Sequence, residues 1–281
     1  MIVKRTINGG TKRYVEVLER DFETGHDQDD AYYVDSCVTL DSPVAIGSAT
    51  VASPVVITAT AHGCANGDQV KITKIKGMTE LNGNRYLVAN KTTNTFKITD
   101  LEGNNIDGTA FAAYDSGGEV RKMVATVSGL GHLEGETVNV WADDYVHPPV
   151  TVSSGGITLD GKASVVQAGL GYCHKMTTLK LEAGAVTGTA VGKIKKVHAA
   201  TFVLLNAYTM EVSVDGGAKR KLDFRQVDSG YDSSVPLFSG ERFEDLGGDW
   251  TRDTRVTIEG DDPAPFTLLA FAPEIRTNEA R

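Results

Sequence analysis

Hydrophobic and polar residues alternate in short runs along most of the chain. The run Glu136–Ala142 places Val138, Val140 and Ala142 at every second position. This spacing is the period of a strand that buries one face. Glycine, asparagine and aspartate separate such runs, so the pattern predicts an all-β chain with many turns.

The opening residues predict a hairpin. Two alternating runs, 3–7 and 13–19, flank Asn8-Gly9, and an Asn-Gly pair accepts the positive φ angles of a two-residue hairpin turn. Further strands are expected at 31–35, 54–60, 69–73, 84–89, 95–99, 117–121, 150–152, 157–159, 254–258 and 266–271.

Two stretches depart from simple alternation. Residues 194–207 fit both a helical and a strand period, and their β-branched content favours a strand. Pro263, Pro265 and Pro273 flank the run 266–271, and we expect them to end that strand because proline lacks an amide hydrogen.

Composition agrees with a β-rich chain. The 281 residues include 30 glycines, 30 valines and 29 threonines, and 41% are hydrophobic. That is enough to bury one large core or two medium ones. No apolar run reaches the ~18 residues of a membrane span, so we expect no membrane span, and the first residues do not resemble a secretion signal.

Charge and cysteines exclude several classes of protein. A formal charge of −9 argues against groove-reading nucleic-acid binding, which needs a basic face. Cys37, Cys64 and Cys173 lie far apart and form no paired motif. We therefore expect free thiols and synthesis in a reducing cytoplasm.

Residues 42–122 are expected to form a separate compact module, because short strands and Gly/Asn turns recur there at regular intervals. The expected fold is thus a β-sandwich or barrel host domain, built from residues 1–41 and 123–281, with an inserted small β-barrel at 42–122.

Two parts of the chain resemble known families. Residues 3–16, 127–138, 243–250 and 265–270 resemble tail nozzle and tubular structural proteins of short-tailed bacteriophages, where such motifs occupy the C-terminal part of a longer chain. The start at Met1, almost on the first motif, predicts either a shortened relative or a fragment.

The module carries its own resemblance. Residues 61–63, 66–68, 78–83 and Tyr86 resemble the first catalytic cysteine half-domain of ubiquitin-activating enzymes, a small β module found inserted in phage structural proteins. This resemblance implies a fold and no ubiquitin chemistry.

The nozzle resemblance implies a virion structural protein, made in the host cytoplasm, that forms a sixfold homo-oligomeric ring. Other phage tail proteins are its expected partners, and DNA passes through without sequence-specific binding. We expect assembly through residues 1–20 and 243–273. The alternative is a peripheral tail module that binds a fibre, a receptor or a host glycan through Tyr86, Phe96, Phe111 and Tyr114, although those aromatics are better interpreted as core.

An enzyme acting on cell-wall polymers ranks last. His62-Gly63-Cys64 invites a nucleophile-and-base interpretation, yet adjacent turn residues rarely face each other. Asp143-Asp144 and Asp261-Asp262 invite a glycosidase interpretation, but each pair is better interpreted as a turn. We predict no catalytic residue and no enzyme.

Three further features are interpreted as structural. The carboxylates of the acidic loop lack the spacing of a calcium site; they are Asp21, Glu23, Asp27, Asp29 and Asp30. Gly129-Leu130-Gly131 lacks the third glycine of a phosphate loop. Two basic clusters are expected to protect exposed strand edges; they are Lys193, Lys195 and Lys196, and Lys219, Arg220 and Lys221. No metal or cofactor is predicted.

Overall fold

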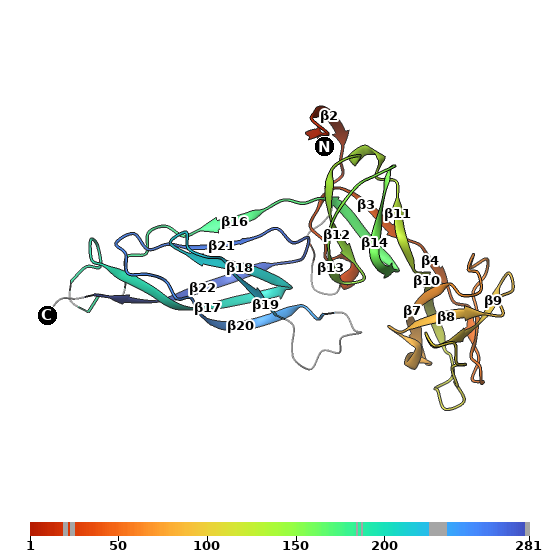
Figure 1. Ribbon diagram of the computed structural model, residues 1–281. Helices are drawn as coiled ribbons and strands as arrows, with labels where there is room; N and C mark the ends of the chain where they lie inside the picture. The colour runs from red at the N-terminus through yellow and green to blue at the C-terminus, as the bar shows by residue number, and fades with distance from the viewer. Residues whose placement is uncertain (19–21, 23–25, 184, 187, 225–234, 279–281) are drawn as a thin grey trace. The chain divides into compact units, whose positions relative to one another are not determined.

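The computed structural model describes residues 1–18, 22, 26–183, 185–186, 188–224 and 235–278. The fold is all-β, with 53% of residues in strands, and its strands pair in antiparallel sheets (Figure 1). Only short 3-10 turns interrupt the strands in this part of the chain. No helix among these residues has the length and apolarity needed to cross a membrane.

The chain forms two compact units. The first contains residues 1–18, 36–143 and 147–170, and the second contains residues 19–35, 144–146 and 171–281. The expected division into a host domain, 1–41 and 123–281, around a module at 42–122 stays a prediction.

The first unit opens with a hairpin. Strand β1 (Ile2–Ile7) pairs with β2 (Gly10–Val15) in register Ile2 to Val15. The turn residues Asn8 and Gly9 have φ angles of 46° and 72°, as the sequence predicts for a two-residue turn. The two strands form a sheet of their own and pair with no other strand in the described chain.

A seven-stranded sheet follows, in the order β4-β10-β7-β8-β9-β6-β5. Its strands are β4 (Pro43–Ala45), β5 (Ser48–Ala49), β6 (Val56–Thr58), β7 (Gln69–Lys76), β8 (Arg85–Ala89), β9 (Thr95–Thr99) and β10 (Ser116–Lys122), with the 3-10 turn η2 (Thr79–Leu81). The Ile46 amide donates to Gly118 O and the Gly47 amide to Thr58 O. The continuous segment 43–49 thus pairs with β10 at one end of the sheet and with β6 at the other. The sheet therefore closes into a small barrel around buried Ile57, Ile72 and Phe96.

The rest of the first unit contains two smaller sheets, β11-β14 and β13-β12-β15-β3. Their elements are β3 (Asp35–Asp41), β11 (Val124–Ser128), β12 (Thr137–Ala142), β13 (Tyr145–Thr151), β14 (Gly156–Ala163), β15 (Val165–Leu170) and the 3-10 turn η3 (Gly131–Leu133). Val138 and Val140 are buried, as their alternation predicts, and so is Trp141.

The second unit has two sheets, β16-β21-β18-β19 and β20-β17-β22. The strands are β16 (His174–Thr177), β17 (Lys195–Ala207), β18 (Thr209–Val214), β19 (Arg220–Asp223), β20 (Phe238–Asp245), β21 (Val256–Gly260) and β22 (Thr267–Thr277), and the 3-10 turn η1 (Gln28–Asp30) also belongs here. One core contains Phe202 and Leu204 of β17, Val212 of β18 and Ile258 of β21. The ambiguous stretch 194–207 is thus a strand, as its β-branched content indicated.

Two expectations about strand bounds are wrong. Residues Ala31–Val34 are not a strand, and β3 begins at Asp35; the Tyr33 amide instead donates to Pro263 O in a loop contact. Pro273 does not end the last strand, since β22 runs on to Thr277. Because β22 is an edge strand, one of its sides needs no ladder partner, and a residue without an amide hydrogen is tolerated there.

Two glycines of the barrel, Gly77 and Gly83, allow the tightness of its backbone packing to be tested. Gly77 and Gly83 both have positive φ, but a Cβ on Gly77 would lie 2.2 Å from Ala113 O, whereas a Cβ on Gly83 would meet nothing within 4 Å. We expect Gly77→Ala to lower the free energy of unfolding by about 2–5 kcal/mol and Gly83→Ala by about 1–2 kcal/mol. Urea unfolding measures both, and equal losses would show that the close approach is not rigid.

Candidate functional site

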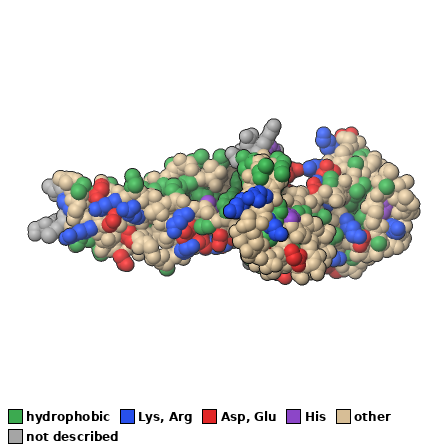
Figure 2. All heavy atoms as spheres, turned by 90° about the horizontal axis from the view of Figure 1, so that it is seen from above, with side chains coloured by type: hydrophobic (Ala, Val, Ile, Leu, Met, Phe, Trp, Pro, Cys, Tyr) green, Lys and Arg blue, Asp and Glu red, His purple; other side chains and the backbone are tan. Residues whose placement is uncertain are grey.

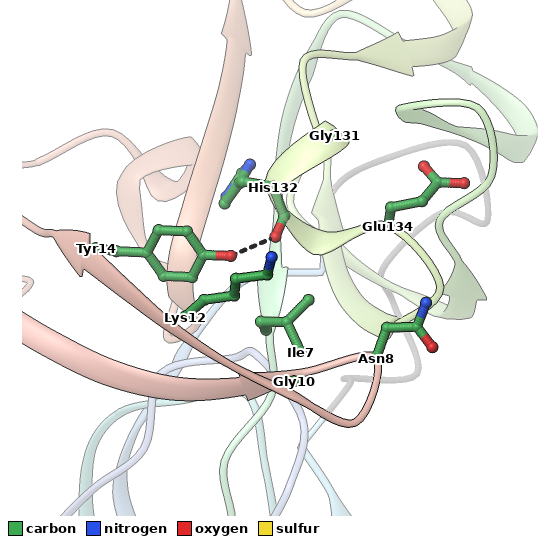
Figure 3. Close-up of a pocket in the computed structure, with 8 residues that line it drawn as sticks. All are labelled: Ile7, Asn8, Gly10, Lys12, Tyr14, Gly131, His132 and Glu134. Atoms are coloured by element: carbon green, nitrogen blue, oxygen red, sulfur yellow. Dashed lines mark hydrogen bonds between the residues drawn. The ribbon is translucent and has the colours of Figure 1, made fainter.

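One hollow lies between the β1–β2 hairpin and the η3 turn, within the first unit. It has a volume of about 440 Å³. Figure 3 shows side chains of the hairpin directed toward the η3 segment. The lining residues are Ile7, Asn8, Gly10, Lys12, Tyr14, Gly131, His132 and Glu134.

Polar contacts hold the hairpin over this hollow. The Tyr14 hydroxyl donates to His132 O at 2.6 Å, and the two rings meet edge to face with centroids 5.7 Å apart. The His132 imidazole Nε2 lies 2.9 Å from Ser36 O. At the turn, the Asn8 amide donates to the Glu136 carboxylate.

Glu16 fastens the open end of the hairpin. Its carboxylate accepts two hydrogen bonds from the Arg5 guanidinium, at 2.9 and 2.8 Å, and another from the Ser36 hydroxyl. The Arg5 hydrogen bonds hold the pKa of Glu16 below its ordinary value, against the opposing effect of burial. The hairpin is therefore a fixed arm, held through one of its faces.

The side chains of Glu134, His132 and Tyr14, which line the hollow, are engaged in the fold. The Glu134 carboxylate accepts from the amides of Ser154 and Gly155 at 2.9 and 2.7 Å, while His132 and Tyr14 have the partners given above. Lys12 is exposed. This arrangement positions a protein segment, and it pairs no nucleophile with a base.

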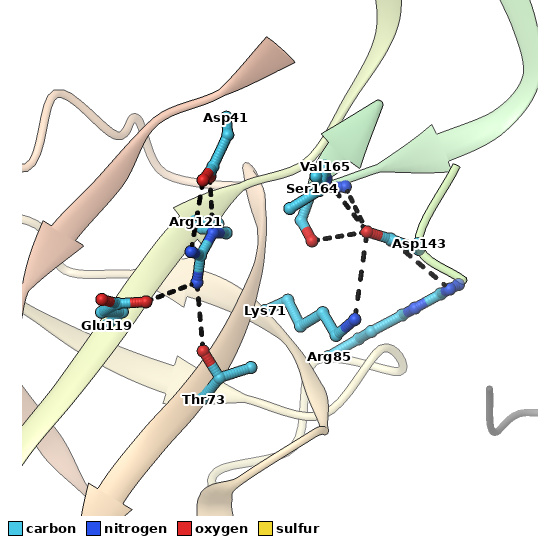
Figure 4. A network of polar contacts seen from close by, with 9 residues as sticks. All are labelled: Asp41, Lys71, Thr73, Arg85, Glu119, Arg121, Asp143, Ser164 and Val165. Carbon is cyan, nitrogen blue, oxygen red and sulfur yellow. Dashed lines mark hydrogen bonds and ion pairs between the residues drawn. The ribbon is translucent and has the colours of Figure 1, made fainter. Parts of the chain in front are cut away.

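Arg121 and Asp143 anchor a second polar network, drawn in Figure 4. Arg121 lies on β10 with only 8% of its side chain exposed. Its Nε donates to Asp41 at 2.7 Å, and its Nη1 lies 2.8 Å from Glu119 in an ion pair. The same Nη1 donates to the Thr73 hydroxyl at 3.2 Å, and Nη2 donates to Asp41 at 3.5 Å. A buried guanidinium needs such carboxylates because desolvation penalises an unpaired charge.

Asp143 is a structural acceptor. Its Oδ1 accepts from the Ser164 amide and hydroxyl and from the Val165 amide, and Lys71 and Arg85 lie at 3.9 and 3.8 Å. With Asp144 it forms the turn that the sequence predicts, since both residues have positive φ. The carboxylate of Asp143 is thus engaged in the fold.

His62 and Cys64 also form a turn. The Cys64 amide donates to His62 Nδ1 at 3.1 Å, while the thiol faces His62 O at 3.4 Å. Burial, followed by nearby Asp68, raises the pKa of the thiol. This geometry leaves the sulfur unactivated. Gly63 and Gly67 both have positive φ.

The acidic loop lies partly outside the described residues, which exclude Asp21 and Glu23. Asp29 and Asp30 belong to η1, and Asp27 precedes it. No group of three or more histidine, cysteine, aspartate or glutamate residues in the described part of the chain could hold a metal ion.

The second basic cluster is neutralised by carboxylates. Lys219 lies 2.9 Å from Glu259, Arg220 lies 2.9 Å from Glu244, and Lys221 lies 2.7 Å from Asp262. Asp262 therefore serves as a partner for a lysine. Figure 2 shows acidic and basic side chains interspersed on the visible face, a distribution unlike the basic stripe of a nucleic-acid binder.

The expectation that Lys195 lies on an exposed edge is wrong. Its side chain is fully buried, and its ammonium lies 2.7 Å from Glu182 and 3.4 Å from Arg252 O. Lys195 is on β17, the central strand of its sheet, so its position has no free edge to protect. Sequence could not show this, because Glu182 lies in an irregular segment. Lys193 and Lys196 are half-buried.

The remaining candidates are structural. Leu130, in the Gly129-Leu130-Gly131 stretch, is buried, and Gly131 opens the three-residue turn η3. The four aromatics considered for glycan stacking pack in or against the barrel core, as predicted: Tyr86, Phe96, Phe111 and Tyr114. Cys37, Cys64 and Cys173 form no disulfide within the described residues.

Comparison with known proteins identifies one segment. Residues 53–123 match the family model of the ubiquitin-activating enzyme E1 FCCH domain, which confirms the resemblance inferred for the module. The match covers the barrel from just before β6 to just past β10. The chain matches no curated protein sequence.

Glu16 makes the hairpin sensitive to pH. Its carboxylate has a lowered pKa in the folded chain, so its contribution to stability is present above the ordinary value of 4.5 and is lost as the pH falls through the folded value. We expect Glu16→Gln to cost about 1–2 kcal/mol at pH 7 and progressively less at lower pH. Urea titrations between pH 7 and 3 measure this difference, and a gap that does not change with pH would contradict the assignment.

The cysteines are expected to differ in reactivity. Cys173 is exposed, whereas Cys64 is buried and its thiol has a raised pKa. Because the thiolate is the reactive form, iodoacetamide at pH 8 should alkylate Cys173 at least tenfold faster. Peptide mass spectrometry over time measures both rates; similar rates in native protein would show that the His62–Cys64 turn opens.

Proposed function

We propose that the chain is a structural subunit of a short-tailed phage tail, a nozzle or tube component that assembles with its own copies into a ring through which DNA passes. The fixed β1–β2 hairpin supports this proposal most directly. Its strands have no partner strand in the described chain, although it is tied down firmly through one face.

Exposed apolar side chains cluster in the same segment. Ile2, Val15, Val17 and Leu18 are 77–84% exposed. Exposed apolar side chains gathered in one segment mark an interaction site. Residues 1–20 were expected to act in assembly from the nozzle resemblance, and the hairpin gives that expectation a physical basis.

The module and the charge fit the same function. The FCCH-like barrel is a fold without implied chemistry, and its polar side chains clamp neighbouring strands. The charge of −9 suits a lumen past which DNA must slide without sticking. The protein would reside in the virion after synthesis in the host cytoplasm, with other tail proteins as its partners.

The alternative, a peripheral module that binds a fibre, receptor or glycan, has less support. The aromatics that would stack on sugars serve the barrel core. No described feature of the module favours a glycan site over packing.

Light scattering of the purified full chain tests the proposal. We expect multimers, with a closed ring of six times the 30.0 kDa chain mass, and rings with a central hole in negative-stain electron micrographs. A chain that stays monomeric at high concentration, both alone and with tail proteins of the same phage, would overturn the proposal. Specific glycan-array binding by such a monomer would favour the alternative, and hydrolysis of peptidoglycan would indicate an enzyme.

A further inference from the structure

We propose that the solvent-facing side of the β1–β2 hairpin of one copy docks onto the solvent-facing side of the β20-β17-β22 sheet of a second copy. This inference rests on the proposed self-assembly and names the two surfaces that form the contact.

The outer face of the hairpin combines apolar and basic side chains. The register places Ile2 opposite Val15, Lys4 opposite Arg13, and Thr6 opposite Thr11. All six side chains are exposed, whereas Val3, Arg5 and Tyr14 on the other face are half-buried. This face therefore presents an apolar row, a basic row and a polar row in succession.

The hairpin differs in charge from the rest of the chain. Residues 1–15 hold four of the 28 basic side chains and none of the 37 acidic ones. Lys4 and Arg13 form no ion pair within the described chain. Two unpaired cations beside exposed apolar residues favour a partner surface that is acidic and apolar.

The β20-β17-β22 sheet has such a surface. Its inner face packs in the core through Phe202 and Leu204. On the outer face the register sets Phe243, Thr201 and Ala272 in one row, and Glu241, Val203 and Ala270 in the next. Phe243 is 53% exposed.

Acidic side chains border this outer face. Glu241 and Asp245 flank Phe243 on β20, and both are exposed. Neither carboxylate forms an ion pair in the part of the chain that the structure describes. On β22, Glu274 occupies the row of Asp245 through their common partner Ala199. The surface thus has small and apolar side chains at its centre and is acidic beside Phe243 on β20, while Lys196 and Arg276 form the pair beyond Glu274.

The two surfaces are complementary in both respects. Ile2 and Val15 can cover Phe243 while Lys4 and Arg13 meet Glu241 and Asp245. The contact joins different patches on the two copies, so each copy can give its hairpin to one neighbour and receive a hairpin from another. Such a head-to-tail contact produces a ring when the rotation closes.

Charge exchange tests the contact in the full-length chain. Lys4→Glu/Arg13→Glu sets an acidic hairpin against an acidic sheet, and Glu241→Lys/Asp245→Lys sets a basic hairpin against a basic sheet. We expect each double variant to raise the dissociation constant at least tenfold, measured by analytical ultracentrifugation. The quadruple variant, and an equimolar mixture of the two double variants, should regain assembly because opposite charges meet again.

A matched control reproduces the charge change of the Lys4→Glu/Arg13→Glu variant at a site away from both surfaces. Lys76→Glu/Lys91→Glu changes two exposed lysines of the module and should assemble like the unchanged chain. Circular dichroism spectra of all variants should match, which separates loss of assembly from loss of folding.

The outcomes distinguish the two proposals. If the unchanged chain assembles and neither double variant weakens assembly, or if the natively folded quadruple variant fails to regain it, the docking is overturned and the proposed function stands. If the unchanged chain remains monomeric at high concentration, both alone and with tail proteins of the same phage, both proposals are overturned. Carbodiimide coupling in a mixture of ¹⁴N- and ¹⁵N-labelled chains should link Lys4 to Glu241 or Asp245 between copies; links found only within one copy would also overturn the docking.

Discussion

The edges of β-sheets impose the main constraint on this chain. Every edge strand presents amide and carbonyl groups that need a partner or solvent, and the described residues form no α-helix that could cover them. The barrel of the first unit removes its edges, because Ile46 and Gly47 join the two ends of one sheet. The second unit tolerates Pro273 on an edge strand. In the described chain the β1–β2 hairpin neither closes into a barrel nor pairs with a further strand, so its outer edges remain open to a second chain.

Buried charged side chains connect neighbouring segments of this fold. Asp143, Arg121 and Lys195 are buried, and each is surrounded by hydrogen-bonding or charged partners. Removing one partner of such a buried pair leaves an uncompensated charge and is strongly destabilising. The same residue types appear in active sites, yet these three groups are already committed to backbone amides, a hydroxyl or opposite charges.

Sequence predicted the parts of the fold that depend on local backbone preferences. Asn8-Gly9 and Asp143-Asp144 are turns because their residues accept positive φ, and Glu136–Ala142 contains a strand because its alternation matches the pleat. The core positions of Tyr86 and Phe96 followed from the strands around them. Where local preference decides the structure, one sequence was sufficient.

The features that the sequence did not predict depend on contacts between residues far apart in the chain. Lys195 is buried because Glu182 reaches it from an irregular segment, and Pro273 is tolerated because β17 lies on only one side of its strand. At the hollow next to the hairpin, Tyr14 donates a hydrogen bond to His132, which lies more than a hundred residues further along the chain. Alternating hydrophobicity carries no signal for such pairings, although the basic hairpin in an acidic chain was visible in the sequence as an imbalance of charge.

The two ends of the barrel segment in the first unit lie next to each other. Pro43 on β4 lies directly opposite Arg121 on β10, so the polypeptide enters and leaves the barrel on adjacent strands, and Asp41 clasps Arg121 across that point. The whole barrel therefore stands between β3 and β11, where a simple loop could connect the same two strands. Evolution can therefore gain, lose or exchange such a cassette in one step while the surrounding strands keep their pairing.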